Sequence, residues 1–381
     1  MSEGFGSGGA AEDRRWMGEA LALAADALGT TWPNPAVGCI LVRDGGVVVG
    51  RGVTRPGGRP HAETVAVREA GPQARGATAY VTLEPCAHAR VDGPCAELLA
   101  AAGVARVVVA LRDPDPRVEG GGIAKLRAAG IKVEIGCRAA EAGELNAGHL
   151  KRMARGLPFC ALKLAQSLDG RIATATGESR WITGEAARAE GHRLRARHDA
   201  IMIGSGTALA DDPLLTCRDS PGLEHRSPVR IVLDRRLRLP PTSRLARSAR
   251  EVPVWVVAGP DADEAAAEVL GAQGCEVLRV PDAAGDGEGN GGMASALAAL
   301  AGRGITRLFV EGGAEVAAAL LRAHLVDRLH LFTAPILLGS EALPGVGPLG
   351  QGRLAGAPRW RRVEGRALGD DRLDVLDAAT P

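Results

Sequence analysis

The sequence predicts a two-domain protein of the α/β class, and three observations support this. The chain has 381 residues, more than a single domain usually contains. Runs rich in Val, Ile and Leu alternate with segments of helical spacing, which is typical of layered α/β folds. A helix predicted from Glu141 to Arg155 is broken by Gly156-Leu157-Pro158. We therefore expect a disordered Gly-rich tail over 1–13, one domain over 14–155 and a second over 156–381.

The composition argues against several classes of function. Residues 1–150 contain 16 Lys and Arg against 17 Asp and Glu, and the rest contains 30 against 28, so neither half has the basic excess of a nucleic-acid-binding protein. The chain has no apolar run of about 18 residues that would span a membrane, and its N-terminus does not resemble a signal peptide. Seven scattered cysteines, an odd number, do not suggest a disulfide framework. We expect a cytoplasmic enzyme with a small substrate.

In the first domain, predicted helices and strands alternate. Asp44-Gly45-Gly46 predicts a hairpin turn between the first two strands. Helices are expected over 14–28, 61–70, 95–102 and 124–129, and strands over 37–42, 47–49, 79–83, 104–110 and 131–135.

The second domain repeats the alternation and offers two glycine-rich turns. Gly204-Ser205-Gly206 follows a strand but lacks the third Gly of a dinucleotide-binding fingerprint, so we reject that interpretation. Glu311-Gly312-Gly313 opens a helix and is a candidate phosphate-binding turn, although such glycine pairs are more often simple turns. Strands are expected over 160–164, 200–203, 230–233, 254–258, 308–310 and 330–332, helices over 185–197 and 314–321, and a loop over 283–292.

The stretch from His61 to Cys95 carries the clearest chemistry. It contains His61-x-Glu63, then Pro85-Cys86 and, nine positions after Cys86, Pro94-Cys95. Two thiolates and one imidazole can hold Zn²⁺ tetrahedrally and leave a position for water, whose pKa the metal lowers to roughly 7. Glu63 can then carry a proton from the water to a departing amine. The pattern predicts a zinc-dependent deaminase with one zinc ion per chain, and it leaves His88 open as an alternative ligand.

Together with Pro33-Asn34-Pro35, Glu84-Pro85-Cys86 and Asp113-Pro114-x-Pro116, these motifs resemble the family of bifunctional riboflavin-biosynthesis deaminase–reductases. The resemblance implies a cytidine-deaminase-like αβα fold for the first domain. It also implies the site residues: zinc ligands His61, Cys86 and Cys95, proton carrier Glu63, and substrate contacts Asn34 and Asp113.

One segment departs from the family pattern, which usually reads Cys-x-His-x-Gly-(Arg/Lys)-Thr-Pro-Pro-Cys. The basic residue that resembles a substrate-phosphate contact falls at Val91, and the family's basic residue before Gly122 is replaced by Gly121. Because the loop length is unchanged, we hypothesise that the neighbouring Arg90 takes over the phosphate contact.

The second half resembles the reductase domain of the same family. The motifs are Leu162-Lys163-x-Ala165-x-Ser167-Leu168-Asp169-Gly170, Gly177-Glu178-Ser179-x-Trp181-Ile182, Leu194-Arg195-Ala196, Leu209-Ala210-Asp211-Asp212-Pro213 and Phe309-Val310-Glu311-Gly312-Gly313. The resemblance implies a dihydrofolate-reductase-like domain that uses NADPH. It places Ala165, Trp181, Thr207, Asp211 and Gly313 near the cofactor, Ser179, Arg195, Leu215, Arg218 and Glu311 near the substrate, and Lys163 as a catalytic contact.

The expected function is deamination of a phosphoribosylamino-diaminopyrimidinone followed by NADPH reduction of its ribosyl group. We also expect a homo-oligomer. Three alternatives remain: a monofunctional reductase whose zinc domain is inactive, a nucleic-acid-editing deaminase fused to a binding domain, and a zinc-stabilised nucleotide-binding module without catalysis. The near-neutral charge of both halves argues against the second alternative.

Overall fold

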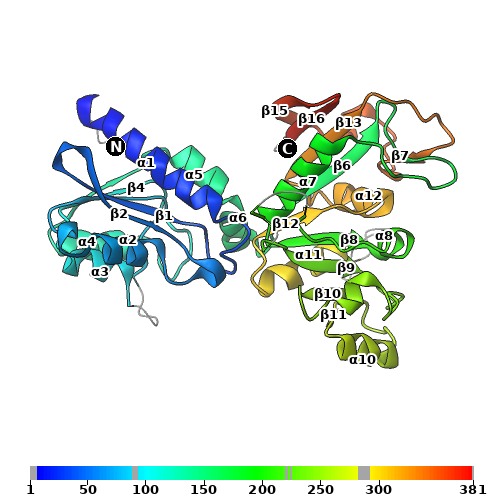
Figure 1. The fold of residues 1–381 in the computed structure, drawn as a ribbon, viewed down its shortest axis with the longest axis horizontal. Coiled ribbons are helices and arrows are strands. Elements are labelled where there is room, and N and C mark those ends of the chain that lie inside the picture. The colour runs from blue at the N-terminus through cyan, green and yellow to red at the C-terminus, as the bar shows by residue number, and fades with distance from the viewer. Residues whose placement is uncertain (1–6, 88–92, 219–221, 224, 282–291, 380–381) are drawn as a thin grey trace. The chain divides into compact units, whose positions relative to one another are not determined.

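The computed structural model describes residues 7–87, 93–218, 222–223, 225–281 and 292–379. The chain divides into two units, Met1–Gly156 and Leu157–Pro381, each with its own sheet (Figure 1). The division lies one residue beyond the boundary expected from the sequence. Both units combine sheets with helices, so the predicted α/β class is confirmed.

The first unit is a three-layer αβα arrangement around a five-stranded sheet of order β2-β1-β3-β4-β5. β1 is antiparallel to β2 and β3, whereas β3, β4 and β5 are parallel. The elements are α1 (Ser7–Asp26), β1 (Gly38–Arg43), β2 (Val47–Val53), α2 (Ala62–Ala70), β3 (Thr78–Val81), α3 (Cys95–Ala101), β4 (Arg106–Val109), α4 (Gly121–Ala128), β5 (Lys132–Ile135), α5 (Ala139–Leu145) and α6 (Ala147–Arg155).

The alternation of side chains along the strands builds two cores. Cys39 and Leu41 of β1 belong to the core that α2, α3 and α4 cover. Ile40 and Val42 point the other way and belong to the core that α1 and α5 cover. Because successive strand residues face opposite sides, one apolar strand can hold a helical layer on each face.

The start of α1 corrects one prediction. Residues 7–13 were expected in a disordered tail, yet α1 begins at Ser7. Asp13 is 2% exposed and accepts hydrogen bonds from the Tyr80 hydroxyl at 2.9 Å and from two nitrogens of Arg106 at 2.8 and 2.6 Å. These partners lie on β3 and β4, so a tertiary contact that local composition does not reveal fixes this part of the helix.

The end of the first unit also differs from the prediction. The single helix expected from Glu141 to Arg155 is two helices, α5 and α6, which meet at Asn146. Asn146 is buried and has a non-helical backbone (φ −98°, ψ 17°). The break redirects α6, and Gly156 in the left-handed conformation ends it as predicted.

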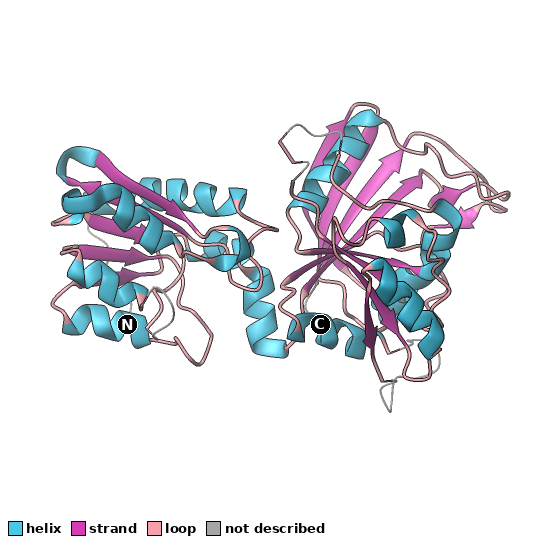
Figure 2. Cartoon of the chain, turned by 60° about the horizontal axis from the view of Figure 1, so that its bottom comes forward, coloured by secondary structure: helices cyan, strands magenta, loops and turns pink. Residues whose placement is uncertain are grey.

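The second unit is built on a nine-stranded sheet of order β11-β10-β9-β8-β12-β6-β13-β16-β15, with helices beside it (Figure 2). Its first seven strands are parallel, and β16 and β15 are antiparallel additions at one edge. The elements are β6 (Phe159–Ser167), β7 (Arg171–Ala173), α7 (Glu185–Ala196), β8 (Ala200–Gly204), α8 (Ser205–Asp211), β9 (Val229–Leu233), α9 (Arg244–Arg247), β10 (Val254–Ala258), α10 (Glu264–Gln273), β11 (Glu276–Arg279), α11 (Met293–Gly302), β12 (Arg307–Val310), α12 (Ala314–Arg322), β13 (Arg328–Ala334), β14 (Leu343–Pro344), β15 (Trp360–Leu368) and β16 (Asp371–Ala378).

The remaining regular elements are small. β14 pairs with β7 in a separate two-stranded sheet. Short 3-10 helices lie at Asp44–Gly46, Pro56–Gly58, Gly71–Ala74 and Leu354–Gly356. Within the part of the chain that the structure describes, no helix is long and apolar enough to cross a membrane.

Replacing Asp13 tests whether it anchors α1. We expect Asp13→Ala to lower the free energy of unfolding of the first unit by about 2–3 kcal/mol, because it leaves the half-buried Arg106 without one of its partners. Scanning calorimetry would measure the loss, and hydrogen exchange would show faster opening of α1. Glu19→Ala, which removes only an exposed contact with Arg15, should cost less than about 1 kcal/mol. Equal effects of the two substitutions would contradict this role of Asp13.

Candidate active sites

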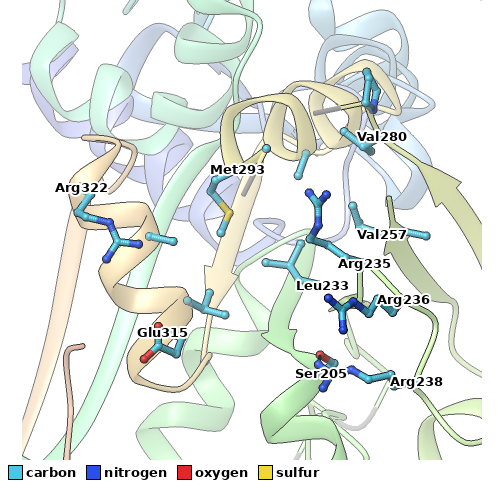
Figure 3. A pocket seen from close by; sticks show the side chains of 16 residues that line it. Ser205, Leu233, Arg235, Arg236, Arg238, Val257, Val280, Met293, Glu315 and Arg322 are labelled. Carbon is cyan, nitrogen blue, oxygen red and sulfur yellow. Dashed lines mark hydrogen bonds between the residues drawn. The ribbon is translucent and has the colours of Figure 1, made fainter. Parts of the chain in front are cut away.

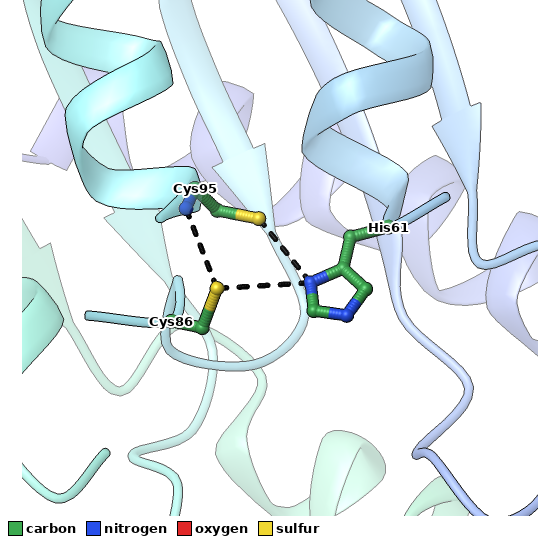
Figure 4. A group of neighbouring side chains, drawn as sticks. All are labelled: His61, Cys86 and Cys95. Atoms are coloured by element: carbon green, nitrogen blue, oxygen red, sulfur yellow. Dashed lines mark hydrogen bonds between the residues drawn. The ribbon is translucent and has the colours of Figure 1, made fainter. Parts of the chain in front are cut away.

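Three potential metal ligands converge in the first unit. His61 precedes α2, Cys95 begins α3, and Cys86 lies in the loop after β3. His61 Nδ1 lies 3.3 Å from Cys95 Sγ and 3.7 Å from Cys86 Sγ, and all three ligand atoms lie within 4.8 Å of one another (Figure 4). A tetrahedral zinc ion would place a nitrogen and a sulfur ligand about 3.6 Å apart. The observed spacing therefore fits zinc.

Hydrogen bonding favours a thiolate at Cys86. The backbone N–H of Cys95, at the start of α3, donates to Cys86 Sγ at 3.3 Å. Contact with the Cys95 thiol, together with His61 and this N–H, lowers the pKa of the Cys86 thiol to about 4. Thiolate is the form of cysteine that binds a metal, so the surroundings prepare Cys86 for ligation.

The Glu84 carboxylate links the same loop to the start of α4. Its Oε1 accepts the N–H groups of Gly122 and Ile123 at 3.1 and 3.2 Å, and its Oε2 accepts that of Gly120 at 3.2 Å. Glu84 thus satisfies N–H groups at the start of α4, which have no partner within the helix. A Cβ at Gly122 would lie only 1.8 Å from the Pro85 carbonyl oxygen, so the approach of α4 to this loop requires glycine.

Glu63 lies in the first turn of α2 beside the metal ligands. Its side chain is buried, and burial raises the pKa of its carboxyl group to about 7. A carboxyl group that titrates near neutral pH can both take up and release a proton at that pH. The site therefore combines potential metal ligands with a group suited to proton transfer.

The cavity beside these residues gathers most of the predicted deaminase site. Asn34, His61, Glu63, Cys86 and Asp113 all line it, although they come from distant parts of the chain. His88 and Arg90 lie outside the described residues, so the alternative ligand and the phosphate hypothesis stay open. His149, Arg152 and Met153 also line the cavity, and sequence reasoning missed them.

The second unit contains a cavity of about 630 Å³ that holds most of the predicted reductase site. This is large enough for a small-molecule site. The predicted residues that line it are Lys163, Ala165, Ser179, Arg195, Thr207, Asp211, Leu215, Glu311 and Gly313. Gly204 and Gly206 line it as well, so the rejected fingerprint segment nevertheless borders this site.

A buried ion pair organises this cavity. Arg195 donates from Nε and Nη2 to the two carboxylate oxygens of Glu311 at 2.6 and 2.9 Å, and its Nη1 donates to the Thr216 carbonyl at 3.1 Å. Lys163 Nζ lies 3.6 Å from Glu311 Oε2. Burial alone would raise the pKa of Glu311, but Arg195 and Lys163 outweigh it and hold the pKa at about 2. The Glu311 carboxylate therefore stays ionised at neutral pH.

The glycine pair after β12 allows α12 to begin close to this ion pair. A Cβ at Gly312 would lie 2.7 Å from the Cβ of Val316, one turn into α12. Gly313 is the residue before the helix, and Thr207 Oγ1 lies 3.4 Å from where its Cβ would be. The turn that the sequence suggested for phosphate binding is thus a helix start that faces the cavity.

Two predicted residues do not line the cavity. Trp181 is 66% exposed, and the Arg188 guanidinium lies 4.5 Å from its ring centroid. Arg218 is exposed, and its backbone N–H donates to His192 Nδ1 at 3.3 Å. Neither is among the residues around the cavity, so the structure does not bring these two together with the other predicted reductase residues.

A second cavity of about 420 Å³ adjoins the first, and the two share Glu315 and Val316 of α12. Arg235, Arg236 and Arg238 line it from the segment after β9, and Arg322 lines it from α12 (Figure 3). Sequence reasoning missed this group. The sequence did contain a signal for this group, because three arginines lie within four positions just after a buried strand of a parallel sheet.

Comparison with known proteins extends these observations. Residues 10–111 match the cytidine and deoxycytidylate deaminase zinc-binding region, and residues 158–373 match the RibD C-terminal domain. The chain is 42% identical over 375 residues to the riboflavin biosynthesis protein RibD of Escherichia coli, covering 94% of this chain and 98% of that one. The corresponding protein of Mycobacterium tuberculosis is 38% identical over 366 residues, covering 95% and 96%.

Solved structures agree along nearly the whole chain. Acinetobacter baumannii RibD superposes with a TM-score of 0.87 at 38% identity, covering 97% of this chain and 100% of that one. A Thermotoga maritima protein described as a diaminohydroxyphosphoribosylaminopyrimidine deaminase/5-amino-6-(5-phosphoribosylamino)uracil reductase superposes with a TM-score of 0.84 at 31% identity, with the same coverage. Both units are covered by these matches, and the chain therefore belongs to the RibD family of bifunctional riboflavin-biosynthesis deaminase–reductases.

Proposed function

We propose that the chain carries out two successive steps of riboflavin biosynthesis. The first is hydrolytic deamination of 2,5-diamino-6-(5-phosphoribosylamino)pyrimidin-4-one, and the second is NADPH reduction of the ribosyl group to ribityl. The observation that carries the proposal is that the ligand atoms of His61, Cys86 and Cys95 lie within 4.8 Å of one another, beside a cavity that the buried Glu63 lines. The presence of both units favours this function over a monofunctional reductase.

In the first unit, we assign zinc ligation to His61, Cys86 and Cys95. Bound zinc would supply a water molecule of lowered pKa. Glu63 takes a proton from that water and delivers it to the amino group, so that ammonia leaves and the ring gains a carbonyl oxygen. Asn34 and Asp113 hold the pyrimidine, because the carboxylate can accept hydrogen bonds from its N–H groups and the amide can both donate and accept. Arg90 remains our candidate for the phosphate contact.

In the second unit, bound NADPH would supply the hydride that reduces C1′ of the opened sugar. Glu311 stays ionised and faces the cavity, where it can accept hydrogen bonds from sugar hydroxyls. Arg195 holds Glu311 through two hydrogen bonds and lines the same cavity, where its remaining N–H groups can donate to the substrate. Lys163 lies beside the same carboxylate and is our candidate for a direct catalytic contact.

The two adjoining cavities of the second unit together offer a site for the cofactor. We assign the nicotinamide end to the cavity of Ala165, Thr207 and Asp211, and the phosphates to the Gly313 helix start. The adenosine end then reaches the adjoining cavity, where Arg235, Arg236 and Arg238 can bind the 2′-phosphate that distinguishes NADPH from NADH. The expected homo-oligomer stays a prediction.

Substitution of the cysteines tests the metal site. Cys86→Ser and Cys95→Ser should lower the zinc content from one ion per chain towards none, because a thiolate is the better zinc ligand. Elemental analysis by plasma mass spectrometry would measure this. Cys137→Ser and Cys275→Ser, at buried positions away from the cluster, should keep the zinc. Full zinc in both Cys86→Ser and Cys95→Ser, with loss of zinc in His88→Ala, would overturn our ligand set.

Substitution of Glu63 separates proton transfer from metal binding. Glu63→Gln keeps the shape of the side chain but removes the titrating group, so deamination should fall by roughly 10²-fold or more while zinc stays bound. Ammonia release measures the first step. NADPH oxidation with already deaminated substrate is the internal control and should not change. Near-normal ammonia release by the zinc-loaded variant would show that another group moves the proton.

Substitution of Arg236 tests the choice of cofactor. We expect Arg236→Ala to weaken NADPH binding about 10-fold or more and to change NADH binding by less than about threefold, because only NADPH carries the 2′-phosphate. Titration calorimetry would give both dissociation constants. Arg250→Ala is a matched control, since Arg250 is exposed in the same unit and donates to the Ala272 carbonyl outside the cavity. An equal loss of affinity for both cofactors would contradict the assignment.

A further inference from the structure

One face of α6 forms a wall of the deaminase cavity. His149, Arg152 and Met153 line it, and their spacing places them on the same side of the helix. Arg152 also donates from Nη1 to the Pro33 carbonyl at 3.3 Å, next to Asn34. The final helix of the unit thus contacts the segments that carry both proposed substrate-binding side chains, Asn34 and Asp113.

The contact between His149 and Asp113 is buried and direct. His149 Nε2 lies 2.9 Å from Asp113 Oδ1, and both residues are less than 10% exposed. The same oxygen accepts the backbone N–H of Asp115 at 3.0 Å. Both hydrogen bonds reach one oxygen of the carboxylate, and no hydrogen bond from the described residues reaches Oδ2. This arrangement fixes the rotation of the carboxylate and leaves one oxygen for a ligand.

The surroundings of His149 also determine which ring nitrogen carries the hydrogen. Nδ1 is buried without a hydrogen-bond partner among the described residues, whereas Nε2 faces the Asp113 oxygen. With the hydrogen on Nδ1, that N–H would be buried without an acceptor, and the lone pair of Nε2 would face the Asp113 oxygen with no hydrogen between them. The ring hydrogen therefore belongs on Nε2, where it is donated to Asp113.

We propose that His149 is a positioning residue for the deamination step. By donating to Asp113 Oδ1, it presents Oδ2 to an N–H group on the edge of the aminopyrimidine. His149 need not touch the substrate itself. The inference rests on the proposed function, in which Asp113 contacts the pyrimidine.

Two variants of His149 test the hydrogen bond. His149→Leu removes the donor, so Asp113 should bind substrate less well, and KM for deamination should rise about 10- to 100-fold with kcat within about threefold. His149→Gln should stay within about threefold of the unchanged enzyme in KM, because its amide nitrogen can take the place of Nε2. Lys151→Ala, on the same helix but outside the cavity lining, is the control and should leave KM unchanged.

Measurements of zinc content and of the reductase step distinguish a positioning role of His149 from a role in folding. All three variants should keep one zinc ion per chain and normal NADPH oxidation with deaminated substrate. A purely structural role of His149 would lower zinc content or kcat and leave KM alone. If His149→Leu fails to fold, a comparison of His149→Gln with His149→Asn still tests the hydrogen bond. The Asn side chain is too short to reach Asp113. Equal KM values for the Gln and Asn variants would overturn the proposal.

A double-mutant cycle tests whether His149 acts through Asp113. Once Asp113→Ala has raised KM, adding His149→Leu should raise it by no more than about twofold further, because the group that His149 positions is gone. Independent, multiplying effects on KM would contradict the proposal. Failure of the unchanged enzyme to release ammonia would instead refute the proposed function. A normal KM in Asp113→Ala would refute the substrate contact on which this inference rests.

Discussion

The first unit depends on the close approach of three helix starts to the loop that follows β3. Cys86 accepts the N–H of Cys95 at the start of α3, Glu84 accepts the first N–H groups of α4, and His61 stands at the start of α2. Helix N-termini carry partial positive charge and N–H groups without partners in the helix. They therefore stabilise the two negative groups of this loop before any metal binds, and the ligand geometry follows from the folding of the backbone.

The second unit uses a different constraint, the buried pair of Arg195 and Glu311. Arg195 comes from α7, and Glu311 follows β12, so the pair joins a helix to the carboxyl end of a central strand. Ligand sites of parallel sheets lie at these carboxyl ends. The arginines after β9 and the glycine turn after β12 lie at the same edge of the sheet, which explains why the two cavities adjoin and share part of their lining.

Local patterns predicted most of the elements but missed those that depend on distant contacts. The exposed strand β15 carries many charged residues and was not predicted as a strand, yet it pairs along its length with β16. The start of α1 escaped prediction because Asp13 is held by Tyr80 and Arg106, far along the chain. The break at Asn146 was not predicted, because the helix propensities of these residues favour a continuous helix. Tertiary packing overrides so weak a preference.

By itself, the sequence determined the chemistry of this protein. His61-x-Glu63 with two Pro-Cys pairs predicted zinc-dependent deamination from residue type and short spacing, whereas the reductase followed from the resemblance of the second set of motifs to a known family. Only the tertiary structure decided which side chains share a cavity. It brought His149 into contact with Asp113 and Arg195 into contact with Glu311, placed Arg322 at the same cavity as the arginines after β9, and left Trp181 exposed. Such contacts join residues tens to more than a hundred positions apart, and their geometry is set by the packing of helices on sheets, which no local pattern contains.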